Sequence, residues 1–181
     1  MKYEVRFKGR LLPWHKLSLS LATVGCFLCV GTVFAQETLL RVYLDSASKY
    51  KEQEKLDRAA KLYEQALSIC EEIPASEAGQ LEALQGLASV HQAKGRSEDA
   101  EIHYQKALKV GEKALGAEHP RIAQVLSALA MLYESDERFV EAMFCYKRAA
   151  LILQKSPGNT GSIEKFQKRI KLLESKLNER H

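Results

Sequence analysis

Residues that interrupt helices are scarce in this sequence. Of its 181 residues, only 10 are glycine and 4 are proline, whereas 46% are hydrophobic. This composition is typical of a packed helical domain and argues against a disordered chain. The length fits one domain with an appendage, since single domains commonly hold about 100–200 residues.

Signatures of catalysis are also missing. The chain has no H-E-x-x-H, no G-x-S-x-G and no glycine-rich loop that could cradle a phosphate. Its histidines are scattered, and none has a companion at the spacing of metal ligands: His15, His91, His103, His119 and His181. We therefore predict no enzymatic activity, no catalytic residue, no metal site and no cofactor.

Beyond residue 35 the chain lacks an excess of either charge. From Gln36 onward, 22 Lys and Arg residues balance 22 Asp and Glu residues. Proteins that bind nucleic acid need a concentrated basic footprint. The balance therefore argues against a nucleic-acid partner, including the RNA that some helical repeats bind.

The positive excess lies in the first 16 residues, ahead of an uncharged run. The basic residues there face only Glu4, and they are Lys2, Arg6, Lys8, Arg10 and Lys16. Residues 17–34 carry no charge, and Val33 and Ala35 are small residues just before Gln36. This order predicts that residues 1–35 are a signal peptide. A cut between Ala35 and Gln36 would export the body to the bacterial periplasm or the medium.

The alternative is an uncleaved anchor that crosses the membrane once. Eighteen residues are the lower limit for a helix that spans a bilayer, so membrane contact would run only through residues 17–34. In both cases we expect the repeats described next to lie outside the cytoplasm, because the basic flank stays inside.

The rest of the chain repeats itself. Three segments share spacings of 3, 9, 4 and 3 residues, and they begin 41 and 42 residues apart. Their positions are Ala47, Tyr50, Ala59, Tyr63 and Ala66; Ala88, His91, Ala100, Tyr104 and Ala107; and Ala130, Tyr133, Ala142, Tyr146 and Ala149. Spacings of 3 and 4 keep residues on one helical face, and the gap of 9 holds a turn. Each segment is therefore predicted to be a helical hairpin that stacks on its neighbour.

The helix-breaking residues fall between the predicted helices. Gly116 is expected to end one helix, since glycine adopts the left-handed conformation easily. Pro120 is expected to start the next, because proline is tolerated in the first turn. Ser97 is predicted to cap the helix that it begins, with the acidic residues that follow in its first turn.

These repeats resemble tetratricopeptide repeats, and the segment ALGAEHP (114–120) with the long period resembles the repeats of kinesin light chains. The resemblance covers roughly residues 40–155. It implies an all-α fold, a short tetratricopeptide α-solenoid preceded by the signal or transmembrane segment. Its predicted parts are three hairpins within residues 36–156, at about 38–73, 77–115 and 120–155, then a loop and a C-terminal capping helix at 157–181. Glu54 and Glu137 depart from the family, which usually turns on glycine there, as at Gly95.

The last predicted helix has one apolar side. Its apolar residues alternate spacings of 3 and 4, and they are Ile163, Phe166, Ile170, Leu173 and Leu177. As a cap, this side would cover the last hairpin. As an alternative it could pair two chains into a homodimer, although it extends over only about two heptads. Basic residues are predicted to solvate the other side: Lys165, Lys168, Arg169, Lys171 and Lys176.

The family resemblance implies a concave groove, lined by the first helix of each hairpin, that holds a peptide or a helix of a partner protein. Carried over to this sequence, the groove residues are Arg41, Asp45, Lys51, Gln85, Ser89, Gln92, Gln124, Ser127, Met131 and Glu134. Relatives that grip a C-terminal carboxylate use Lys, Arg and Asn at positions that here read Leu44, Ser48, Gln85 and Ser89. No such clamp is therefore predicted.

The predicted function is an exported, non-enzymatic scaffold or adaptor that binds a protein or peptide partner. One alternative is a membrane-anchored assembly scaffold that dimerises, or recruits partners through its C-terminal helix or convex face. Another leaves the inner face solvated and places the partner elsewhere.

Overall fold

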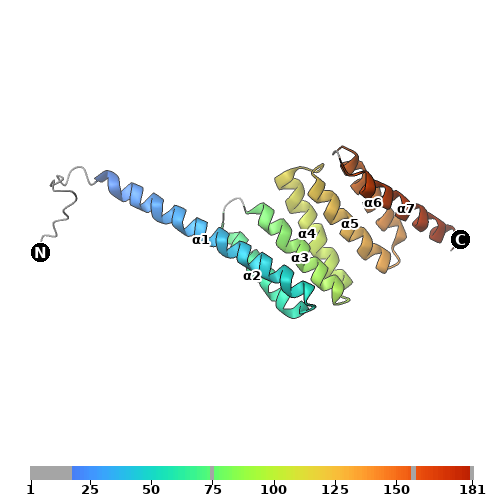
Figure 1. Cartoon of the computed structure of the whole chain (residues 1–181), viewed down its shortest axis with the longest axis horizontal. Coiled ribbons are helices and arrows are strands. Elements are labelled where there is room, and N and C mark those ends of the chain that lie inside the picture. The colour runs from blue at the N-terminus through green and yellow to red at the C-terminus, as the bar shows by residue number, and fades with distance from the viewer. Residues whose placement is uncertain (1–17, 74–75, 156–157, 180–181) are drawn as a thin grey trace, which may run out of the picture. The chain divides into compact units, whose positions relative to one another are not determined.

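The computed structural model describes residues 18–73, 76–155 and 158–179, and this part of the chain forms helices and no strand (Figure 1). The helices are α1 (Ser18–Glu52), α2 (Leu56–Glu72), α3 (Glu77–Ala93), α4 (Ser97–Leu115), α5 (Pro120–Ser135), α6 (Phe139–Gln154) and α7 (Thr160–Asn178). The chain divides into two compact units, Met1–Thr38 and Leu39–His181. The basic residues of the predicted leader (Lys2, Arg6, Lys8, Arg10 and Lys16) and two of the histidines (His15 and His181) lie outside the described residues.

In the first unit, residues 18–38 are helical and belong to α1. The predicted cut between Ala35 and Gln36 lies within this helix. Over the ranges that the structure describes, none of the helices combines the length and the apolar character needed to span a membrane.

In the second unit, the helices pair into three hairpins. Helix α3 packs on α4 and α5 on α6, while successive hairpins meet through α2 on α3 and α4 on α5 (Figure 1). In the first hairpin, the hydroxyls of Ser48 on α1 and Tyr63 on α2 are 3.1 Å apart and share a hydrogen bond. Helix α7 packs on α6. The predicted all-helical solenoid of hairpins is confirmed.

The nine alanines of the repeat lie where helices approach one another. None has any exposed surface: Ala47, Ala59, Ala66, Ala88, Ala100, Ala107, Ala130, Ala142 and Ala149. Tyr63, Tyr104 and Tyr146 are buried beside them. Tyr50 is only half-buried, since no hairpin precedes the first one among the described residues to cover it.

The hairpin turns keep one backbone conformation whichever residue occupies them. The φ angles of Glu54, Gly95 and Glu137 are 58°, 72° and 59°, and the three residues stand at the same place in successive hairpins. A residue with a Cβ pays roughly 1–2 kcal/mol for this left-handed conformation. The two glutamates that depart from the family therefore change the energy of the turn but not its geometry.

Two side chains near helix starts make hydrogen bonds, one between hairpins and one within a helix cap. The predicted cap at Ser97 is wrong: Arg96 precedes the helix without a side-chain capping bond, and the Ser97 hydroxyl donates to Asp136 at 2.8 Å. Ser97 thus links the turns of the second and third hairpins. At the start of another helix, α5, His119 is the cap, because its Nδ1 accepts a hydrogen bond from the Arg121 backbone N–H at 3.2 Å.

Helix α7 covers the end of the stack. Ile170 and Leu173 are buried, with Leu173 only 1% exposed, and Ile163, Phe166 and Leu177 pack partly buried against the same core. The apolar side of α7 is thus occupied within the chain, as the cap interpretation expects. It is not left free as a seam for a second copy.

Candidate functional site

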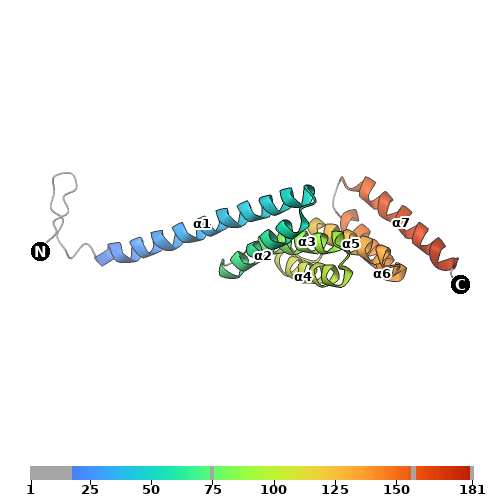
Figure 2. The same cartoon turned by 90° about the horizontal axis from the view of Figure 1, so that it is seen from below.

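The first helices of the hairpins form one face, which we call the first-helix face: α1 from Leu39 onward, α3, α5 and α7. Figure 2 shows α3, α5 and α7 along one side of the row and α4 and α6 along the other. Polar contacts join each first helix to the next, and they are Lys51–Ser89 at 3.2 Å, Glu82–Arg121 at 3.6 Å and Glu134–Arg169 at 2.7 Å. Helix α7 therefore occupies the place that the first helix of a fourth hairpin would take.

The predicted groove residues divide into two groups. The exposed ones are Arg41, Asp45, Gln124 and Met131, and the partly buried ones are Lys51, Gln85, Ser89, Gln92, Ser127 and Glu134. Most of the second group is engaged within the chain. For example, Gln92 accepts a hydrogen bond from the Tyr104 hydroxyl at 3.1 Å, and the Ser127 hydroxyl donates to the Gln124 carbonyl at 2.9 Å. The exposed residues are therefore the ones available to a partner.

A hollow of about 240 Å³ lies where α5, the start of α6 and α7 meet. Its lining comprises Met131, Glu134, Ser135, Phe139, Arg169, Leu173 and Lys176. Met131 is 59% exposed, whereas the Glu134 side chain is 9% exposed beneath Arg169. The Lys176 ammonium lies 5.3 Å from the centre of the Phe139 ring, close enough for a cation–π contact. The hollow thus offers an apolar contact next to positive charge.

The positions of the two cations in this hollow differ from those predicted from the sequence. The sequence predicts Arg169 and Lys176 on a solvated side of the last helix, but both line the hollow with Met131. Arg169 is held by Glu134, whose carboxylate raises the pKa of the guanidinium by accepting its hydrogen bonds. The spacing of Arg169 and Lys176 along α7 does not indicate that they line the hollow, because their place there depends on how α7 crosses α5.

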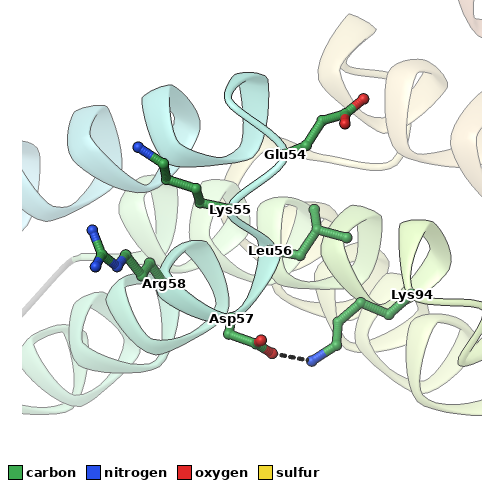
Figure 3. A pocket seen from close by; sticks show the side chains of 6 residues that line it. All are labelled: Glu54, Lys55, Leu56, Asp57, Arg58 and Lys94. Atoms are coloured by element: carbon green, nitrogen blue, oxygen red, sulfur yellow. Dashed lines mark hydrogen bonds and ion pairs between the residues drawn. The ribbon is translucent and has the colours of Figure 1, made fainter.

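Two adjoining hollows lie at the turn of the first hairpin. The larger, about 640 Å³, is lined by Glu54, Lys55, Leu56, Asp57, Arg58 and Lys94 (Figure 3). Lys94 lies 2.5 Å from Asp57 and lowers the pKa of its carboxyl. Figure 3 shows Lys55 and Arg58 pointing to one side of the turn and Glu54 to the other.

The smaller hollow at this turn, about 410 Å³, has three cations in its lining and no acid. It is lined by Ser46, Lys49, Tyr50, Gln53, Lys55 and Arg58. Lys55 and Arg58 each place their charge 5.8 Å from the centre of the Tyr50 ring. These cations could not be identified as a group from the sequence, because nothing in their spacing marks them as one.

A more apolar hollow lies on the opposite side, between α4 and α6. It measures about 430 Å³, and its lining includes Leu108, Leu126, Leu129, Tyr133, Val140, Phe144 and Cys145. Phe144 on its rim is 68% exposed. Burial raises the pKa of the Cys145 thiol to about 11, so this cysteine remains a neutral packing residue.

Comparison with known proteins agrees with this architecture. Models of the tetratricopeptide repeat match residues 40–73 and 79–155. The chain is 36% identical over 113 residues to the mitochondrial tetratricopeptide repeat protein 19 of Rattus norvegicus, which covers 61% of this chain and 30% of that protein. The chain thus spans less than a third of that relative.

Solved structures show the same fold. The crystal structure of BtubC (BKLC) from P. vanneervenii superposes with a TM-score of 0.70 at 25% identity, covering 76% of this chain and 56% of that one. A putative kinesin light chain from Podosopora anserina, with nearly identical repeats of the tetratricopeptide type, gives 0.63 at 24% identity, covering 74% and 64%. The resemblance to the longer repeats of kinesin light chains is confirmed. The chain therefore belongs to the tetratricopeptide repeat family.

Proposed function

We propose that the repeats form a scaffold that holds a segment of a protein partner against the first-helix face. The observation that carries the proposal is the exposure of Met131. This large apolar side chain is 59% exposed and lines the hollow that also contains Arg169 and Lys176. An apolar side chain of the partner would pack on Met131. An acidic neighbour in the partner would pair with Lys176, which has no acidic partner among the described residues.

The other polar residues of the face suit an extended segment or a helix that runs across it. Arg41, Asp45 and Gln124 are exposed, and they belong to α1 and α5. Their mixed charges would fix direction and register rather than supply most of the affinity, since exposed ion pairs contribute little. Most of the affinity would come from the apolar contact at Met131, since burial of apolar surface is favourable.

Site-specific photo-crosslinking in the native host tests this assignment. A photoreactive phenylalanine analogue at position 131 is expected to trap a distinct partner. Leu151 on α6 is the matched control, because it is 60% exposed and lies outside the hollow. Adducts that form equally at both positions, or only at 151, would contradict a partner on the first-helix face.

A second surface has a specific observation in its favour. Val140, Phe144 and Leu151 are each exposed by 60% or more and lie at helical spacing on α6. Val140 and Phe144 line the hollow between α4 and α6. This is the alternative in which partners are recruited on the convex side. Adducts at position 144 without adducts at 131 would assign the partner to this surface.

We further propose that the scaffold works outside the cytoplasm as the processed chain Gln36–His181. The basic leader and the uncharged run at 17–34 support this proposal. The intact mass of the protein from its own host, with the fraction that yields it, is the measurement. We expect the mass of Gln36–His181 in a soluble fraction. A full-length mass held in membranes would favour the anchored scaffold, and a full-length cytosolic product would contradict export.

A further inference from the structure

Two histidine rings stack inside the middle hairpin. The ring centres of His91 on α3 and His103 on α4 lie 5.1 Å apart, with 20° between the ring planes. His91 is 7% exposed and is the one buried polar residue in the described part of the chain. The Nδ1 atoms of both rings are buried and have no hydrogen-bond partner. Buried polar atoms are usually paired, so this arrangement needs an explanation.

The pair is peculiar to the middle hairpin. The positions equivalent to His91 hold Tyr50 and Tyr133, and those equivalent to His103 hold Leu62 and Cys145. Only the second hairpin therefore joins its two helices through imidazoles. The packing itself does not require them, because the other hairpins close with different residues.

The geometry does not suit a metal ion. Imidazoles that share a metal direct their lone pairs at one point, whereas nearly parallel stacked rings direct them side by side. Within the described ranges, no group of three or more histidine, cysteine or acidic side chains is placed to hold a metal. The remaining property of an imidazole pair is its ability to take up protons near neutral pH.

The surroundings oppose a charge on either ring. Burial is the largest cause that lowers the pKa of His91 and of His103 below the ordinary 6.5, followed by Arg96 for His91 and by His91 itself for His103. The charged groups around the pair are Glu64 of α2, Lys94 and Arg96 of the turn, and Asp99 and Lys106 of α4. The two acids favour the charged rings, but their effect is smaller, and Asp99 is already paired with Arg96 at 2.7 Å.

We propose that the His91–His103 stack is an acid-sensitive joint that holds α3 to α4 while both rings are neutral and loosens when either takes up a proton. A proton on one ring leaves a buried charge without an acceptor, and a proton on the second places two like charges face to face. The next residue on each helix makes the Tyr104–Gln92 hydrogen bond of 3.1 Å. Loosening the joint would thus also shift Gln92 on the first-helix face.

The direction of the pH effect follows from linkage. Because both rings bind protons less readily in the folded chain than in the unfolded chain, acid favours unfolding. The stability that the neutral pair contributes is complete above the ordinary pKa of 6.5. It is lost as the pH falls from there through the lower pKa values of the folded state.

Urea unfolding of the full chain between pH 5 and 8 tests the joint. For the wild type, we expect the unfolding constant to rise severalfold from pH 7.5 to pH 5.5, because the unfolded chain takes up protons on both imidazoles more readily than the folded chain does. The double variant His91→Tyr/His103→Phe keeps two rings without titratable nitrogens, and it should lose most of this rise. His119→Asn is the control, since it removes a histidine outside the stack and keeps a capping acceptor; its rise should match the wild type.

Direct titration of the imidazole Cε1–H signals of the wild type by NMR gives a result that does not depend on the variants. The signals of His91 and His103 are expected to titrate below pH 6.5. The proposal is overturned if both titrate at or above that value, or if the double variant unfolds with the same pH dependence as the wild type.

Discussion

Replacement of Gly86 by alanine is expected to destabilise the repeats by about 2–3 kcal/mol, the range of a serious overpacking. Gly86 is buried on α3, and a Cβ added there would lie 2.3 Å from two carbons of the Tyr63 ring. That ring belongs to the preceding hairpin, is 2% exposed and shares a hydrogen bond with Ser48. It has little room to retreat, so the first two hairpins must move apart.

Urea unfolding of the full chain measures this loss. Gly161→Ala is the matched control, because Gly161 is also helical and an added Cβ meets nothing within 4 Å; that change should leave stability equal or slightly higher, as alanine favours helix. In a Tyr63→Leu background the cost of Gly86→Ala should fall by half or more. An equal cost in both backgrounds would show that the Tyr63 contact is not its cause.

Replacement of Leu173 by alanine is expected to cost about 2–5 kcal/mol, the range for truncating a buried leucine. Leu173 is 1% exposed and is among the largest fully buried side chains. It belongs to the apolar side by which α7 covers the last hairpin, so the cavity would loosen the cap as well as the core. Because Leu173 also lines the hollow beside Met131, partner binding on the first-helix face should weaken with it.

Its neighbour provides the control. Leu172 is 44% exposed, and Leu172→Ala should change the free energy of unfolding by less than about 0.5 kcal/mol, as surface substitutions usually do. Chemical denaturation of both variants gives the comparison. Equal losses at 172 and 173 would contradict the orientation of α7 as a cap, and so would a negligible loss at 173.

The candidate site was only partly predictable. The sequence placed Met131 and Glu134 on the inner face through the family resemblance, and the structure brings them into one hollow. It could not indicate that Arg169 completes this hollow, because 35 residues separate Arg169 from Glu134. A helix presents basic residues on its polar side whether that side meets solvent or a neighbouring helix.

The stacked histidines were also only partly predictable from the sequence. The repeat pattern marked His91 as a packing residue, and the structure buries it. Its partner His103 carries no signal in the sequence, since it is offset by one residue from the regular Tyr104. That the two rings meet depends on the angle at which α3 crosses α4.

The sequence by itself determined the helical hairpins, their number and their order, because the spacings of 3 and 4 place alanine and tyrosine on one helical face and the gap of 9 leaves room for a turn. It also determined where turns occur, even at Glu54 and Glu137, because these residues stand at the same place in the repeat as Gly95 and adopt the same left-handed conformation. Only the tertiary structure decided which polar side chains are engaged between helices, which remain exposed on the first-helix face, and that α7 extends this face. The physical reason is that these contacts join residues some 35 to 40 positions apart, such as Lys51 with Ser89, so they depend on how whole helices pack rather than on the pattern within any one of them.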